Sequence, residues 1–251
     1  RAIRDVYKRQ KLNDPNATQK DINDAKAALD KARTELDKYN TDTTKLEKSV
    51  ADHGKDAEGA NPAVEGTKDS DAYRNASDPH FVDENGTPDE EKNKQAREAK
   101  TAYDKALAEA QALLEKHNDA NTPQDAKPRQ AEIDAAFAKL EEARKTLVGD
   151  DSALDKPGFG TKTTDLDVEL AKSSPVDATD PTPGTVEDLT TYKNALAKTT
   201  EDGKENPDIT RYKEALKKAT KLAEKQKSTK ASERPLQKDV DEAYRALLDA
   251  K

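Results

Sequence analysis

Three histidines, His53, His80 and His117, are the side chains best suited to bind a metal or transfer a proton in this 251-residue chain, which contains no cysteine. Zinc sites and catalytic bases need such groups at a fixed spacing, for example His-x-x-x-His on one face of a helix. No two of these histidines are spaced in that way, and each falls in an expected loop or at an expected helix end. We therefore interpret all three as surface polar residues and predict neither a metal nor a cofactor.

Calcium binding is the second chemistry to consider, in the segment 83–91 with the sequence DENGTPDEE. Asp83 and Asn85 precede Gly86, and Asp89 and Glu90 follow it. An EF-hand loop needs ligands at spaced positions and a glutamate at the twelfth, and this segment does not provide that pattern. We interpret the segment as a solvated turn in which Gly86 takes a positive φ.

Motifs of catalysis are missing from the sequence. It contains neither a Gly-x-Ser-x-Gly elbow nor a phosphate-binding loop. The 52 acidic residues are so frequent that a glycosidase pair of carboxylates cannot be recognised among them. We predict that the protein is not an enzyme.

Tyrosines are the remaining candidates, because an aromatic ring can stack on a sugar. Tyr103, Tyr212 and Tyr244 fall on the same helical stripes as Leu and Ala, so we predict that they pack in a core or are half-buried. Tyr73 and Tyr192 lie in short contexts that fit a helix start or a loop. We single out these two as the candidate ligand-binding residues.

The composition predicts helices. Charged residues make up 38% of the chain and aromatic residues 4%, the mean hydropathy is −1.15, and much of the apolar content is Ala, the best helix former. The net charge is −8 with both signs interspersed, so we expect no nucleic-acid binding. No apolar run approaches the roughly 20 residues of a membrane span, and we expect no membrane insertion.

The same helical pattern occurs several times. The stripe of residues 101–116 returns in residues 210–225, and the stripe of residues 131–147 returns in residues 238–251. A copy of the second type lies at residues 20–36, with Lys26 in place of the aromatic residue. A recurrence of about 110 residues suits a small domain better than one turn of a solenoid. We therefore predict an all-α fold of tandem three-helix-bundle-like modules.

Local signals mark the ends of these helices and the segments between them. Thr18 and Asp21 form a variant of the capping box, Gly149 reads as a C-terminal cap, and Pro128 moves the start of the next helix to about Arg129. Two stretches rich in Pro, Gly, Asp and Thr, at 54–71 and 173–188, are predicted to be extended, solvated linkers.

The first ten residues, RAIRDVYKRQ, do not fit the repeat. They look like two reading frames of a transposon-end adapter used in sequencing libraries, so we predict that residues 1–10 are non-native. We assign residues 11–40 to the second half of a first repeat, 41–150 to a second repeat with its linker, and 151–251 to a linker and a truncated third repeat. Helix 20–36 would then lack its partner, and we expect it to fray or to dock on a neighbouring surface.

The ordered repeat has a recognisable form. It runs through Leu-x-x-x-Val (Leu46, Val50), Tyr-x-Asn-Ala, Tyr-x-x-Ala-Leu-x-x-Ala, Ala-Thr-Gln at 17–19, and Ile/Val-Asp-x-Ala-x-x-x-Leu-x-x-Ala. This order resembles the FIVAR domain of large Gram-positive surface proteins, including the matrix-binding fibrils of staphylococci. The resemblance implies three-helix modules strung into a stalk, with sugars, hyaluronan or fibronectin as the ligands usually suggested. It brings no residue-level binding motif.

From the repeats and the resemblance we expect a monomeric fragment of a cell-wall-associated surface protein, extracellular, acting as a stalk or adhesin. Weak binding to a host extracellular-matrix protein or glycan could add to that role through avidity. An accessory carbohydrate-binding or linker module of a secreted glycoside hydrolase is the alternative, and an immunoglobulin- or albumin-binding bundle is a third.

Overall fold

The computed structural model describes residues 18–37, 39–54, 66–83, 85–150, 158–175, 179–200 and 203–251. Over these residues the chain is helical and shows two isolated β-bridges but no strand, which confirms the all-α prediction. Residues 1–10, which we predicted to be non-native, lie outside the described residues. The α-helices are α2 (Gln19–Asp37), α3 (Thr44–Gly54), α4 (Asp71–Ser77), α5 (Glu90–Asn118), α6 (Gln130–Val148), α7 (Thr164–Leu170), α8 (Thr190–Leu196), α9 (Pro207–Gln226) and α10 (Gln237–Asp249), and the short 3-10 helices are η1 (Thr67–Asp69), η2 (Val186–Asp188) and η3 (Ala231–Glu233).

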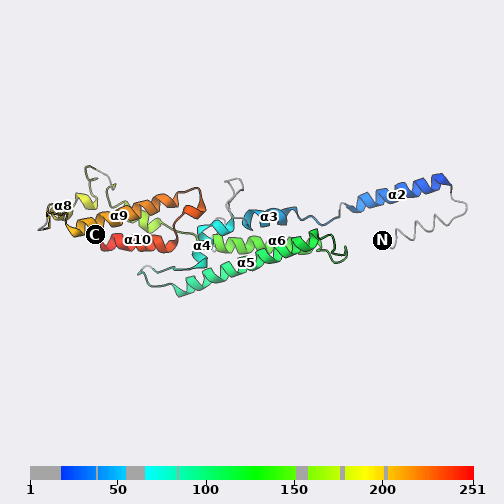
Figure 1. The fold of residues 1–251 in the computed structure, drawn as a ribbon, viewed down its shortest axis with the longest axis horizontal. Helices are drawn as coiled ribbons and strands as arrows, with labels where there is room; N and C mark the ends of the chain where they lie inside the picture. The colour runs from blue at the N-terminus through cyan, green and yellow to red at the C-terminus, as the bar shows by residue number, and fades with distance from the viewer. Residues whose placement is uncertain are drawn as a thin grey trace.

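Two hydrophobic clusters lie along the chain, and Figure 1 shows their helices arranged end to end. The first cluster, here the first core, joins α3, α4, α5 and α6. The second cluster, the second core, joins α7, α9 and α10, with Tyr192 of α8 packed against it. Phe159 follows the predicted boundary at residue 150, yet it packs in the first core. The division into independent modules stays a prediction.

The predicted stripes form both cores. Tyr103 and Tyr212 are 0% and 2% exposed, which confirms the packing predicted for these residues. Most leucines of the same stripes are buried beside them, and Leu113 and Leu222 are half-buried. Tyr244 is half-buried against the second core, as predicted. Each fully buried leucine or isoleucine contributes about 1.5–3 kcal/mol relative to an exposed one, so these stripes are a main source of stability.

Helix ends follow the local signals. Thr18 and Asp21 bond each other reciprocally, with Asp21 Oδ2 accepting from Thr18 N at 2.9 Å. Helix α6 begins at Gln130, and Gly149 terminates it with a φ of 107°, a conformation that favours glycine. The predicted end positions are confirmed at these residues.

The predicted solvated linker at 173–188 is wrong for three of its residues. Ser174, Thr185 and Glu187 are all less than 10% exposed. Ser174 N donates to Glu187 Oε2 at 2.7 Å, and the hydroxyls of Ser174 and Thr185 lie 2.7 Å apart. A turn rich in Thr and Pro can be buried when its polar groups bond one another, and composition alone does not reveal that.

The other predicted linker is also structured where it is described. Of residues 54–71, the described part from Gly66 onward forms η1 and the start of α4, with Thr67 only 5% exposed. The solvated-linker prediction is therefore wrong for this end of the stretch, and residues 55–65 lie outside the described residues.

Helix α2 stands apart from the other described helices (Figure 1). Of its apolar stripe, Ile22, Ala25 and Leu29 are half-buried, whereas Leu36 is 68% exposed. The helix is formed, and among the helices that the structure describes it does not dock on a neighbour. Its expected fraying stays a prediction.

Candidate functional site: the junction between the two cores

Tyr73, on α4, contacts residues of the first core through both its ring and its hydroxyl. The hydroxyl donates to Asp104 Oδ1 at 3.0 Å, and the ring meets Tyr103 edge-on with centroids 6.1 Å apart. Lys100 Nζ lies 4.7 Å from the centroid of the Tyr73 ring. Burial raises the pKa of the Tyr73 hydroxyl. The residue is half-buried, so only part of its surface is open to a ligand.

Tyr192, on α8, occupies the corresponding place in the second core. Its ring is edge-on to Tyr212 with centroids 5.6 Å apart, and the residue is again half-buried. The Tyr212 hydroxyl bonds Glu187 Oε1 at 2.5 Å and Ser173 Oγ at 2.9 Å. The structure does not bring Tyr73 and Tyr192 together, because they belong to different cores. Ligand binding at these two residues stays a prediction.

The candidate metal-binding side chains are dispersed. His53 lies on α3, His80 Nε2 is 3.2 Å from Asp78 Oδ1, and His117 lies near the end of α5. In the part of the chain that the structure describes, no group of three or more His, Asp or Glu residues is placed to hold a metal ion.

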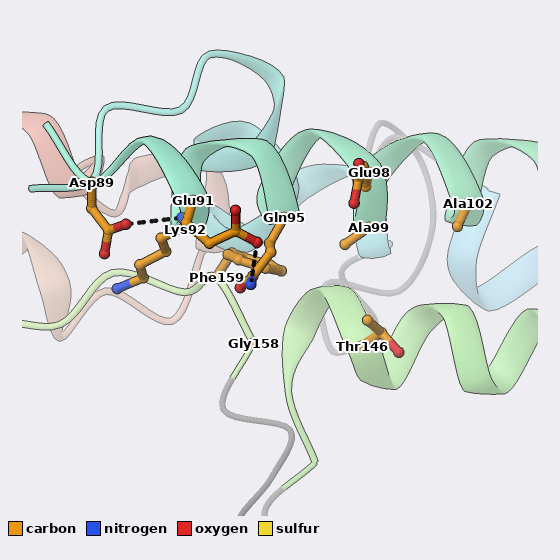
Figure 2. Close-up of a pocket in the computed structure, with 10 residues that line it drawn as sticks. All are labelled: Asp89, Glu91, Lys92, Gln95, Glu98, Ala99, Ala102, Thr146, Gly158 and Phe159. Carbon is orange, nitrogen blue, oxygen red and sulfur yellow. Dashed lines mark hydrogen bonds between the residues drawn. The ribbon is translucent and has the colours of Figure 1, made fainter.

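The calcium candidate is a turn closed by backbone bonds. Asp83 Oδ1 accepts from Asn85 N at 2.9 Å and from Thr87 N at 2.8 Å. The carboxylate therefore accepts hydrogen bonds from backbone N–H groups of its own turn. Gly86 takes a φ of 82°, as predicted. Asp89 caps α5 by accepting from Lys92 N at 2.9 Å, which Figure 2 shows as a dashed line.

Asn75 ties the two cores together. Its Nδ2 donates to Phe159 O at 2.9 Å and to Thr161 Oγ1 at 3.1 Å, and its Oδ1 accepts from Gln237 N at 3.0 Å. The first N–H groups of a helix have no partner within the helix, so Asn75 caps α10 from a distant element. The side chain is 4% exposed, and its amide bonds both the start of α10 and residues 158–163, which lead into α7 and are here called the connecting segment.

Further polar contacts surround this amide. Arg74 Nη2 donates to Ala231 O at 2.6 Å and to Arg234 O at 2.8 Å. Thr161 N donates to Asp71 Oδ2 at 2.9 Å, and Thr161 Oγ1 donates to Pro235 O at 2.9 Å. Since α4 thereby bonds both the connecting segment and the loop before α10, it fixes the second core against the first.

Phe159 anchors the connecting segment in the first core. It is 9% exposed, and its ring lies 5.9 Å from that of Phe81 at an interplanar angle of 57°. Figure 2 shows Phe159 below the first turns of α5, in a shallow pocket of about 660 Å³. The turn before it needs glycine, because Gly158 has a φ of 65° and a Cβ there would lie 2.3 Å from Val148 O.

The N-terminal half of α5 makes this pocket. Within residues 90–100, EEKNKQAREAK, three side chains are at most 6% exposed: Asn93, Ala96 and Ala99. Asn93 brackets Phe81, with Oδ1 accepting from Phe81 N at 2.7 Å and Nδ2 donating to Phe81 O at 3.1 Å. Small residues within a charged run can pack closely in this way without giving a strong apolar signal in the sequence.

A cleft of about 670 Å³ opens between the cores. Its first-core wall includes Phe81 and Lys92, and its second-core wall includes Asp241, Tyr244 and Arg245. Burial raises the pKa of Asp241 and lowers that of Lys92. The cleft therefore brings a cation of the first core, Lys92, near a carboxylate of the second core, Asp241.

Sequence reasoning found the Tyr-x-Asn-Ala repeat but not the role of its asparagine. The signal available was the recurrence of Asn75 as Asn194 in TYKNA. The partners of Asn75 lie 84, 86 and 162 residues away, beyond the reach of any local pattern.

Comparison of the chain with protein-family models, curated proteins and solved structures gave no match. The resemblance to the FIVAR domain therefore stays an interpretation of the sequence. Within the described residues, none of the helices combines the length and the apolar character needed to cross a membrane.

Proposed function

We propose that this chain is a segment of a bacterial, cell-wall-associated surface protein, in which helical units joined at fixed junctions form a stalk. The observation that carries the proposal is the junction itself. Asn75 bonds the connecting segment and the start of α10, while Phe159 inserts into the first core. A stalk that must project a distal region benefits from such junctions, because a flexible linker would let the units fold back.

The test measures whether the two cores keep one orientation relative to each other. The chain has no cysteine, so spin labels can be placed at Ala138→Cys on α6 and Lys221→Cys on α9, both exposed. Double electron–electron resonance should give one narrow distance distribution in the full chain. The distribution should broaden with Asn75→Ala and stay narrow with Asn194→Ala, whose parent side chain is exposed. A distribution that is broad before any substitution would remove the stalk proposal.

We further propose weak binding of a host matrix glycan or protein at the half-buried Tyr73 and Tyr192. The two tyrosines lie at matching places in the two cores, which supports this proposal. Several weak sites on one chain bind a multivalent ligand with a higher overall affinity than a single site does. Titration of the full chain with hyaluronan oligosaccharides, and separately with a fibronectin fragment, should shift the NMR signals of residues around both tyrosines. Unchanged spectra at millimolar oligosaccharide and at saturating fibronectin fragment would exclude this binding.

A further inference from the structure

Helix α2 reproduces α6 in detail. Both helices span 19 residues and begin with glutamine, at Gln19 and Gln130. Each of these glutamines donates from Nε2 to the side chain four residues on, at 3.0 Å to Asn23 and at 2.8 Å to Asp134. The apolar stripes also coincide in register, so the two helices are built to present the same kind of face.

The chain leaves both helices in the same way. Phe159 N donates to Leu147 O at 2.9 Å after α6, and Tyr39 N donates to Leu36 O at 3.0 Å after α2. In both cases the backbone N–H of an aromatic residue that follows the helix donates to the carbonyl of the equivalent leucine. The difference is burial, since Phe159 is 9% exposed and Tyr39 is 78% exposed.

The polar contacts that follow are also repeated. In the second core, Thr161 Oγ1 donates to Pro235 O, and Gln237 exchanges two bonds with Lys162, at 2.7 Å and 3.2 Å. In the first core, Thr41 Oγ1 donates to Pro128 O at 3.1 Å. Gln130 exchanges two bonds with Asp42, again at 2.7 Å and 3.2 Å.

The contacts around Thr161 and Gln237 differ from those around Thr41 and Gln130 in the element that packs over them. The α4–α5 hairpin lies over Phe159, Thr161 and the start of α10, with Asn75 bonding all three. No asparagine of the described residues takes that place beside Thr41 and Gln130. The stripe of α6 is likewise covered, with Ile133, Leu140 and Leu147 at most 2% exposed, whereas Leu36 of α2 is 68% exposed.

We propose that α2, Tyr39, Thr41 and the start of α6 form one docking surface for a helical hairpin of the α4–α5 kind, supplied by another repeat of this type. The hairpin's long helix packs on Ile22, Ala25, Leu29, Ala32 and Leu36. Its short helix places an asparagine on Thr41 and on the N–H of Gln130, and Tyr39 enters its core as Phe159 enters the first core. The proposal rests on the repeated junction and does not depend on a cell-wall location.

The experiment adds a synthetic peptide of residues 66–118, which carries α4 and α5, to the full chain. Fluorescence anisotropy of the labelled peptide should show saturable binding, and hydrogen exchange should show new protection in α2. Ala25→Asp in the full chain should weaken binding at least tenfold, because it places a carboxylate in the apolar contact. Ala27→Asp is the matched control on the opposite face of α2 and should leave binding unchanged.

Two further measurements separate docking on α2 from other events. A peptide with Asn75→Ala should bind more weakly, since it cannot bond Thr41 and Gln130. Binding that Ala25→Asp does not affect would mean that the peptide exchanges with α5 in the first core, and it would overturn the proposal. The absence of saturable binding at millimolar peptide, under conditions where circular dichroism shows the peptide to be helical, would overturn it as well. So would self-association of the full chain that Ala25→Asp abolishes and that excess peptide does not displace, because the occupant of α2 would then not be an α4–α5 hairpin.

Discussion

The side-chain oxygen of Asn75 accepts a hydrogen bond from the backbone N–H of Gln237, 162 residues further along the chain. Through this bond, the last turn of a short helix in one core caps the first turn of a long helix in the other. The same amide donates to Phe159 O and Thr161 Oγ1, so one side chain fixes three segments. The orientation of the two cores therefore depends on this buried amide together with the neighbouring contacts of Arg74 and Thr161.

Asn75→Ala should lower the free energy of unfolding by roughly 1–3 kcal/mol, because it leaves the buried Phe159 O and the half-buried Gln237 N without their bonds. Asn194→Ala is the matched control, since Asn194 occupies the same place in the repeat but is exposed. Urea denaturation followed by circular dichroism measures both. Equal stabilities for the two variants would contradict the role assigned to Asn75.

Phe159→Ala should destabilise the first core, although residue 159 follows the predicted boundary between the repeats. Truncating a buried phenylalanine to alanine lowers the free energy of unfolding by about 3–5 kcal/mol. We expect a loss toward the lower end of this range, because Phe159 is 9% exposed. Tyr39→Ala, at the equivalent exposed position, should change stability by less than about 0.5 kcal/mol.

Hydrogen exchange gives the location of the Phe159→Ala effect. Amides of α5 and α6 should exchange faster in this variant, while those of α9 and α10 change less, because Phe159 packs with the first core. An effect confined to α9 and α10 would contradict this packing.

The sequence allowed the helices and their buried faces to be predicted, because spacings of three and four residues determine which side of a helix is apolar. Tyr103 and Ile133 lie in the core for that reason. The junction was not predictable in the same way. Asn75 and Phe159 act through contacts with residues more than ten positions away, and a local pattern carries no information on which distant elements meet. Thr185 and Glu187 were misjudged because their mutual burial depends on the fold around them.

Acid should weaken the attachment of α7 to the end of α10 through Glu169, which is 4% exposed. Burial alone would raise the pKa of this carboxyl, but hydrogen bonds from Lys172 and Lys251 outweigh that effect and lower it. A carboxyl with a lowered pKa in the folded state contributes stability above its unfolded pKa of about 4.3, and this stability is lost as the pH falls through the folded value.

Denaturation curves between pH 7 and pH 3 test the role of Glu169. The full chain should lose stability below about pH 4.5, and part of that loss should be absent in Glu169→Gln. Glu214→Gln is a control, because Glu214 is an exposed carboxylate on α9. Identical pH profiles for the Glu169→Gln variant and the unmodified chain would show that this carboxyl does not contribute.

Alkaline pH should destabilise the first core through Tyr103. Burial raises the pKa of its hydroxyl to about 12, while an unfolded tyrosine ionises near pH 10. Stability is therefore unaffected by this group below about pH 10 and falls above it, because the unfolded chain then releases a proton that the folded chain retains. Tyr103→Phe should reduce this fall in denaturation curves recorded between pH 9 and pH 11. The difference in absorbance at 295 nm between the full chain and Tyr103→Phe should place the ionisation of Tyr103 well above pH 10, and its ionisation in the folded chain near pH 10 would contradict the buried position.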